Sequence, residues 1–200
     1  MPRDKMANSQ VAANAGIDDT QNLYVPSDGI TKPNLKTVEV DLLGPIYATY
    51  LALHYFRTNE PNTGGKVVIT SSTAGLYGCP PQPQYGTAKF GCIGLARSMG
   101  ENAALQAENI TINAICPSFV PSGLAPPEML ERTFFKILEL MIVMQEKFPH
   151  YITPASTITK AFNMFLNDDS LSGKVAECVI DRIYLRDQHP VCYTLRVLVN

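Results

Sequence analysis

Apolar and polar residues follow one another along the chain in a pattern that predicts strands and helices in alternation. Short apolar runs rich in Val, Ile and Thr, ended by Ser, Gly or Pro, indicate buried strands. The predicted strands are Gln10–Ala15, Lys66–Ser72, Ile110–Cys116 and Val175–Leu185, and the predicted helices are Asn34–Arg57, Tyr85–Leu105, Pro127–Lys147 and Pro154–Leu166. This order is typical of an α/β fold around a mostly parallel sheet.

The carboxyl ends of the predicted strands are the first places to look for a site, because ligands of parallel sheets bind there. The rule directs attention to Ala13–Gly16, Thr70–Gly75, Tyr85–Lys89 and Pro117–Ser122. A second local feature is Pro45, inside the predicted helix Asn34–Arg57. It cannot donate to the carbonyl of Asp41, so we expect a bend there and a carbonyl left for another donor, such as water.

Composition narrows the classes of function. The 200 residues are 46% hydrophobic, enough for one compact domain, and the net charge of −2 with scattered basic residues argues against nucleic acid as a partner. No apolar run reaches the roughly 18–20 residues of a membrane span, and the first ten residues do not resemble a signal peptide. Five cysteines without CxxC spacing predict reduced core thiols in a cytoplasmic protein, and the isolated histidines argue against a metal site.

Tyr85 and Lys89 stand four residues apart, so they are neighbours on one helix face. An ammonium beside a phenol favours the phenolate, and we expect it to draw the tyrosine pKa down from about 10. Tyrosine then becomes a usable general acid or base. Such a spacing arises easily by chance, and an ordinary surface contact is the alternative interpretation.

A serine pair strengthens the catalytic interpretation. Ser71 and Ser72 end a predicted buried strand, where a hydroxyl can hold a carbonyl or alcohol oxygen beside Tyr85. Side chains alternate along a strand, so one of the two serines should point away. Ser72 is our choice for the site, and Ser71 is the competitor.

These residues, together with Asn14-Ala15-Gly16 and Asn113-Ala-Ile-Cys-Pro117, resemble the short-chain dehydrogenase/reductase family over about residues 10–185. Gly44-Pro-Ile-Tyr-Ala-Thr-Tyr50 and the Ser-to-Tyr spacing look most similar to fungal relatives of 15-hydroxyprostaglandin dehydrogenase. The resemblance implies a Rossmann-like, doubly wound parallel sheet. It also implies an oxidoreductase that transfers hydride between NAD or NADP and a secondary alcohol or ketone.

The resemblance also assigns roles to residues. Ser72 would fix the substrate oxygen, Tyr85 would exchange its proton, and Lys89 would lower the tyrosine pKa and bind the nicotinamide ribose. The remaining cofactor contacts would come from the turn after the first strand and the loop after the third, namely Asn14, Ala15, Gly16, Pro117, Ser118, Val120 and Ser122.

The chain departs from the family pattern in three ways. None of its 13 glycines forms the family's GxxxGxG turn, so we expect a single partial domain over 1–200 that lacks the N-terminal half, with irregular residues 1–9 and an unplaced tail at 186–200. Strand Gln10–Ala15 would then be an exposed edge. Asp41 stands where the family has an asparagine; we include it among the catalytic candidates, where it could pair with Lys89. Ser118 stands where the family has a glycine, directly after Pro117.

Segment Leu124–His150 stands where the family carries its substrate-covering helices. Its apolar residues, Phe134, Phe135, Leu138, Met141, Ile142 and Met144, would either line a pocket for an apolar substrate or belong to the core.

Three hypotheses remain open from the sequence. The first is an oxidoreductase. The second is a non-catalytic protein that pairs with itself or with an intact paralogue through helices 34–57 and 85–105, as the family's subunits do. The third is a chain that does not fold stably and keeps its catalytic residues only as relics.

Overall fold

A computed structural model describes residues 9–25, 29–58, 64–120 and 152–188. Its centre is a five-stranded sheet in the order β1-β2-β3-β4-β5. The strands are β1 (Ser9–Ala13), β2 (Gly65–Thr70), β3 (Ile110–Pro117), β4 (Val175–Val179) and β5 (Arg182–Leu185). The first four strands run parallel, and β5 runs antiparallel to β4. In this order β1 pairs only with β2, so it forms one edge of the described sheet, as expected.

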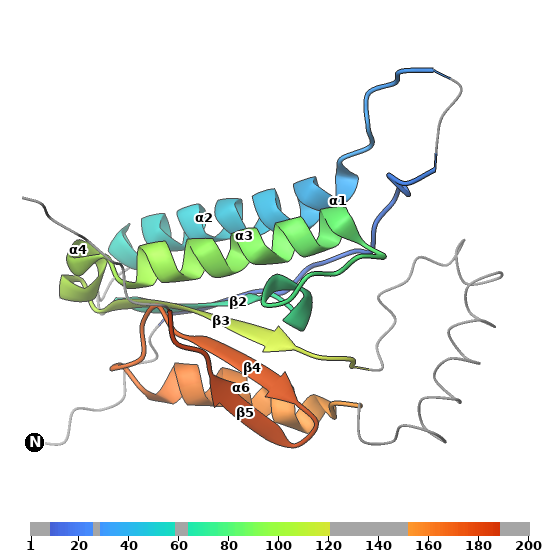
Figure 1. Ribbon diagram of the computed structural model, residues 1–200. Helices are drawn as coiled ribbons and strands as arrows, with labels where there is room; N and C mark the ends of the chain where they lie inside the picture. Colours follow the sequence, from blue (N-terminus) through green and yellow to red (C-terminus); the bar gives the residue numbers. More distant parts are fainter. Residues whose placement is uncertain (1–8, 26–28, 59–63, 121–151, 189–200) are drawn as a thin grey trace, which may run out of the picture.

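Helices cover both faces of the sheet (Figure 1). The helices are α1 (Lys36–Val38), α2 (Gly44–Thr58), α3 (Pro83–Gly100), α4 (Ala103–Ala107) and α6 (Ala155–Asn167). Figure 1 shows α2 and α3 side by side on one face and α6 on the other. This is the doubly wound α/β arrangement that the alternating pattern predicts.

Alternate residues of each central strand fill two separate cores. In β2, Val67 and Ile69 pack in the core beneath α2 and α3, whereas Val68 packs in the core beneath α6. Phe165 of α6 is fully buried in the second core. Because both faces are covered, the central strands are mostly apolar and rich in Val and Ile, and this is why the sequence reveals them clearly.

The predicted helix Asn34–Arg57 is interrupted as Pro45 requires. Between α1 and α2 lies a π-helical stretch, Glu39–Leu43, which ends with the Gly44 N–H donating to the Glu39 carbonyl. Pro45 has no N–H for the Asp41 carbonyl. The Cys92 thiol of α3 binds that carbonyl instead, with 3.1 Å between sulfur and oxygen. The helix is therefore irregular just before Pro45, and a thiol takes the place we assigned to water.

The predicted strand Val175–Leu185 is wrong as one element, because the chain reverses at Ile180 and Asp181. Ile180 adopts a left-handed φ of 58°, which β-branched residues rarely take. Two threonines stabilise it. The Thr153 hydroxyl accepts from the Ile180 N–H at 2.8 Å, and the Thr157 hydroxyl donates to the Ile180 carbonyl at 2.8 Å.

The β4–β5 hairpin is tied to the loop that follows β2. Glu177 of β4 is 4% exposed and pairs with Arg186, just beyond β5. The Tyr77 hydroxyl donates to the same carboxylate at 3.3 Å. Tyr77 follows the short 3₁₀ turn Thr73–Gly75, so this contact holds the loop over the carboxyl edge of the sheet.

The other predicted elements compare as follows. Helix Tyr85–Leu105 starts two residues earlier and divides into α3 and α4, and α6 matches the helix predicted at Pro154–Leu166. Helix Pro127–Lys147 lies outside the described residues. Cys92, Cys116 and Cys178 are buried free thiols, as expected. None of the helices in the described ranges has the length and apolar character needed to cross a membrane.

Candidate active site

The candidate site lies where β1 and β2 end and α3 begins. Ser71 and Ser72 follow β2 directly, and Tyr85 and Lys89 lie in the first two turns of α3. Asn14, Ala15 and Gly16 follow β1 at the same edge of the sheet, because β1 and β2 are parallel and in register. The fold thus gathers residues from three separate stretches of sequence.

The choice between the two serines can be made from their contacts. Ser71 is buried, and its hydroxyl donates to the Lys89 carbonyl at 2.8 Å, so it anchors α3. The Ser72 oxygen accepts from the Ala74 N–H at 3.1 Å, and the Ser72 side chain lies close enough to Tyr85 to lower the pKa of the phenol. Ser72 therefore faces the phenol, as the sequence argument favours, and Ser71 does not.

Lys89 is almost completely buried, and its ammonium makes an ion pair with Asp41. The distance from Nζ to Asp41 Oδ2 is 3.0 Å, and Nζ also donates to the Thr70 carbonyl at 3.2 Å. The ammonium lies 5.3 Å from the centre of the Tyr85 ring. The pairing of Asp41 with Lys89 that the sequence suggested is thus present. An ammonium has three donors, and the described residues occupy two of them, so one N–H is left for a ligand as far as these residues go.

Asp41 has no exposed surface, and its carboxylate contacts both α3 and the turn after β1. Its second oxygen, Oδ1, accepts from the Ile17 N–H at 2.8 Å. A Cβ on Gly16 would lie 3.0 Å from Asp41 Oδ2 and 3.2 Å from Lys89 Nζ. A larger residue would press on both members of the ion pair, so a glycine suits the close approach of the turn after β1.

Lys89 lowers the pKa of Tyr85 as expected, but the pKa of Tyr85 as a whole is raised. Burial of the phenol raises the pKa of Tyr85, and it outweighs the hydrogen bond from Ser72 and the charge of Lys89, which both lower it. The charges of Asp41 and Asp18 raise the pKa further. The paired carboxylate thus opposes the effect of the lysine, which the spacing of Tyr85 and Lys89 alone could not reveal.

Replacing Asp41 with asparagine is expected to lower the pKa of Tyr85. The change removes a charge that raises this pKa and leaves the Lys89 charge, which lowers it. The tyrosinate absorbance is measured against pH for the wild type and for Asp41→Asn. The same curve of each protein's Tyr85→Phe counterpart is subtracted, which leaves the titration of Tyr85. Asp181→Asn, which removes an exposed charge in the hairpin turn, serves as control. A Tyr85 titration unchanged or moved to higher pH in Asp41→Asn would contradict the account.

Gly75 fixes the distance between the serine loop and α3. A Cβ there would lie 2.6 Å from both the Lys89 carbonyl and the Ser71 hydroxyl. We expect Gly75→Ala to destabilise the fold by about 1–3 kcal/mol, because neither neighbour can move without breaking the bond between them. Denaturant unfolding measures the change. Gly78→Ala is the control, since a Cβ there meets nothing within 4 Å; equal losses in the two variants would refute the steric argument.

The predicted cofactor contacts divide into two groups. Asn14 contacts the end of β2, where its side-chain oxygen accepts from the Thr70 hydroxyl at 2.8 Å. Pro117 and Ser118 leave β3 at the same edge, but the Ser118 hydroxyl lies 2.6 Å from that of Thr153 and its N–H donates to the Cys178 carbonyl. These contacts direct Ser118 toward α6 and β4 and not toward Tyr85. Val120 is the last residue described before the gap.

Some of the predicted site lies outside the described residues. This holds for Ser122 and for the six apolar pocket candidates between Phe134 and Met144. Thr70, whose carbonyl accepts from Lys89, lies in the stretch Thr70–Gly75 that the strand-end rule indicated, but the sequence argument assigned it no role of its own. Its position, directly before the serine pair at the strand end, is the signal that could have found it.

Two other site types are not supported by the geometry. Within the described ranges, no three His, Cys, Asp or Glu side chains gather to hold a metal. Burial raises the pKa of Cys92 to about 11 and that of Cys116 to about 12, so neither thiol is a reactive nucleophile near neutral pH.

Comparison with known proteins identifies the family. The model of the family described as short chain dehydrogenase matches residues 10–131. The chain belongs to the short-chain dehydrogenase family. This match contains Ser72, Tyr85 and Lys89, the three residues that the geometry brings together.

Two fungal relatives and one mammalian relative illustrate the likeness. The chain is 32% identical over 202 residues to short-chain dehydrogenase/reductase prx7 of Penicillium rubens, covering 91% of this chain and 68% of that protein. It is 30% identical over 181 residues to prx6 of the same fungus, covering 86% and 55%. It is 29% identical over 176 residues to the 15-hydroxyprostaglandin dehydrogenase [NAD(+)] of Bos taurus, covering 87% and 62%. The chain therefore spans between about half and two thirds of the length of these relatives.

Solved structures of the family share the fold. Levodione reductase superposes with a TM-score of 0.66 at 25% identity, covering 86% of this chain and 65% of that one. A putative 2-deoxy-D-gluconate 3-dehydrogenase from Agrobacterium tumefaciens, determined with bound NADP, gives a TM-score of 0.64 at 20% identity, covering 86% and 66%. These likenesses confirm the Rossmann-like class expected from the sequence.

Proposed function

We propose that this protein is an oxidoreductase that transfers hydride between NAD or NADP and a secondary alcohol or ketone. The observation that carries the proposal is the placement of the Lys89 ammonium 5.3 Å from the centre of the Tyr85 ring, with the Ser72 side chain next to the phenol. The proposal concerns the whole protein, because the chain spans only part of the length of its relatives.

The residues present suit the nicotinamide end of a dinucleotide. Lys89 keeps one N–H for a ribose hydroxyl, and the glycine at position 16 leaves the approach to the ion pair open. Asn14 and Ala15 are exposed at the adjoining strand end. When bound, the nicotinamide supplies or accepts the hydride, and this chain contributes the groups that hold the substrate and move its proton.

Each of the three residues has one task in the proposed reaction. The Ser72 oxygen is occupied as an acceptor by the Ala74 N–H, so its hydroxyl proton can be donated to the substrate oxygen. In reduction of a ketone, the Tyr85 phenol gives its proton to that oxygen as hydride reaches the carbon. In oxidation of an alcohol, the phenolate takes the proton back. Lys89 stabilises the phenolate.

We further propose an apolar, lipid-like substrate. The bovine relative is named for a hydroxyprostaglandin, and the two fungal relatives share the family. The apolar composition of Leu124–His150 supports the same class. A sugar is the competing class of substrate.

The experiment is a turnover assay that follows nicotinamide absorbance with each of the four nucleotides. Long-chain secondary alcohols and ketones are compared with sugar alcohols of equal concentration. We expect turnover of the apolar series and loss of it in the Tyr85→Phe variant. Turnover of sugars alone would refute the proposed substrate class, and turnover that persists in Tyr85→Phe would refute the proposed mechanism.

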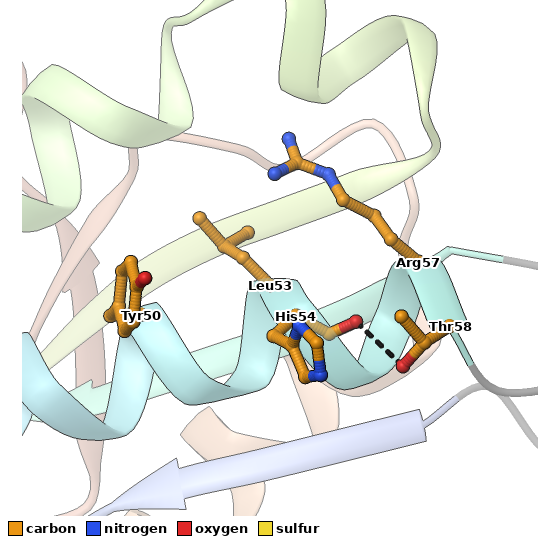
Figure 2. A pocket seen from close by; sticks show the side chains of 5 residues that line it. All are labelled: Tyr50, Leu53, His54, Arg57 and Thr58. Atoms are coloured by element: carbon orange, nitrogen blue, oxygen red, sulfur yellow. Dashed lines mark hydrogen bonds between the residues drawn. The ribbon is translucent and has the colours of Figure 1, made fainter.

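We also propose that two copies of this chain pair through the outer face of α2 and α3. Large apolar side chains at helical spacing are exposed there, namely Ile46, Tyr47, Tyr50, Leu51, Tyr55 and, on α3, Phe90. A shallow hollow also lies along α2, lined by Tyr50, Leu53, His54, Arg57 and Thr58 (Figure 2). It contains none of the candidate catalytic residues, so pairing there would leave the site open.

Light scattering tests the pairing. We expect a dimer, and a monomer once Tyr47 and Leu51 are both replaced with glutamate, because each partner would then bury like charges at the centre of the interface. A wild-type chain that stays monomeric at high concentration would contradict the proposal.

A further inference from the structure

The first turn of α3 is capped by a carboxylate from a distant part of the chain. Asp19 Oδ1 accepts from the Tyr85 N–H at 2.6 Å, and Asp19 Oδ2 accepts from the Gln84 N–H at 3.1 Å. The first N–H groups of a helix have no partner within it. Gln82, which occupies the N-cap position, makes no side-chain capping bond. Asp19 therefore supplies the partner that the local sequence lacks.

The segment that carries Asp19 is fixed on both sides. The Ile17 N–H donates to Asp41 Oδ1 at 2.8 Å, and the Thr20 N–H donates to the Thr37 hydroxyl at 3.2 Å. The Thr37 hydroxyl in turn donates to the Asp18 carbonyl at 2.9 Å, and Thr37 is fully buried. Asp19 is thus held by α1 and the π-helical stretch and not by α3 itself.

Comparison with a second helix cap, that of α4, shows that the Asp19 cap is unusual in coming from a distant part of the chain. Asn102 caps α4 from the adjacent position, accepting from the Ala104 and Leu105 N–H groups at 3.0 and 3.3 Å. Both caps serve two amides, but that of Asn102 is local. Asp19 lies 66 residues before Tyr85 and follows shortly after the Asn14–Gly16 turn. The Asp19 cap therefore joins the proposed cofactor side of the site to the residue that bears the reactive phenol.

We propose that Asp19 is a positioning residue that holds Tyr85 against Ser72 and Lys89 and couples it to the Asn14–Gly16 turn. The role rests on the proposed function of Tyr85. Loss of the cap lets the first turn of α3 fray, and the half-buried phenol then gains water. The local consequence is a mobile Tyr85 amide and a phenol that titrates more nearly as in water, while the rest of α3 stays in place.

The test combines amide hydrogen exchange with the titration of Tyr85, and it needs no turnover. In Asp19→Ala, exchange at the Gln84 and Tyr85 amides should accelerate by about 3- to 30-fold, with Ile93 in the middle of α3 as the internal reference. The charged groups that face Tyr85, namely Lys89, Asp41 and Asp18, all remain. Because burial is the main cause of the raised pKa, Tyr85 should titrate at lower pH in this variant.

Two further variants distinguish loss of the cap from loss of the Asp19 charge and from a general loosening of the fold. Asp19→Asn removes the charge but keeps one acceptor oxygen, which can serve two amides as that of Asn102 does. This variant should retain most of the protection and a titration near that of the wild type. Asn102→Ala removes the matched cap of α4 and should accelerate exchange at Ala104 and Leu105 only. If Asp19→Ala does not fold, Asp19→Ser, whose shorter side chain does not span both amides, replaces it under the same criteria.

Three outcomes would overturn the proposal. One is unchanged exchange at Gln84 and Tyr85 in the capless variant. Another is faster exchange with an unchanged Tyr85 titration, which would make Asp19 an ordinary cap. The third concerns Asp19→Asn. If this variant shifts the Tyr85 titration as far as Asp19→Ala does, while the Gln84 and Tyr85 amides stay protected, the shift is due to the lost charge and not to the lost cap. A positive result in a chain without turnover would leave the positioning role standing, because neither exchange nor titration depends on catalysis.

Discussion

Replacing Lys89 with methionine should destabilise the protein by about 3–5 kcal/mol, because it leaves a carboxylate buried without its ion-pair partner. Asp41 is fully buried and Lys89 is 2% exposed, so water cannot replace the lost ammonium. The Ile17 N–H would remain as a contact of the carboxylate, but it carries no charge. Denaturant unfolding of the wild type and the variant measures the difference in the free energy of unfolding.

Lys36→Met is the matched control for this prediction. Lys36 also pairs with an acidic residue, Glu39, at 3.4 Å, but both side chains are 58% exposed. Exposed pairs of this kind contribute roughly 0–1 kcal/mol. The double variant Asp41→Asn/Lys89→Met removes both charges and should recover part of the loss. A Lys89→Met variant as stable as Lys36→Met would show that the buried pair does not support the fold.

Replacing Tyr85 with phenylalanine should lower turnover by about 10²- to 10⁴-fold, the usual contribution of a general acid or base. The fold should be little affected, because the Ser72 oxygen keeps its bond from the Ala74 N–H. Nucleotide binding should persist, since Lys89 and Asp41 are unchanged. Steady-state kinetics together with nucleotide titration separates the two effects.

Tyr24→Phe is the control for Tyr85→Phe, because it removes the hydroxyl of a tyrosine that is 64% exposed and outside the site. Its turnover should equal that of the wild type. If Tyr85→Phe retains turnover, the proton must come from another group, and the assignment of the acid and base fails.

The sequence was sufficient for the parts of the fold that depend on apolar patterning. The runs around Val67 and Ile112 are buried on both faces by helices, so their composition alone reveals β2 and β3. The hairpin at Ile180 was missed because neither Gly nor Pro marks it. Its left-handed turn is stabilised by hydroxyls of Thr153 and Thr157, from a part of the chain that no local pattern connects to it.

The candidate site likewise has parts that the sequence predicts and parts that only the folded structure reveals. Ser72, Tyr85 and Lys89 follow from strand ends and helical spacing, which are local properties of the sequence. The cap from Asp19 joins positions 66 residues apart and has no local signal. The direction of the Tyr85 pKa depends on burial, which only the packed structure determines.

The central claim, that this chain carries a nicotinamide-dependent site, is tested most directly by calorimetric titration with NAD⁺, NADH, NADP⁺ and NADPH. The account predicts binding of at least one nucleotide at micromolar strength, weakened when Lys89 is replaced. A cooperative thermal transition, measured on the same sample, establishes that the chain is folded. A folded chain that takes up none of the four nucleotides would contradict the account.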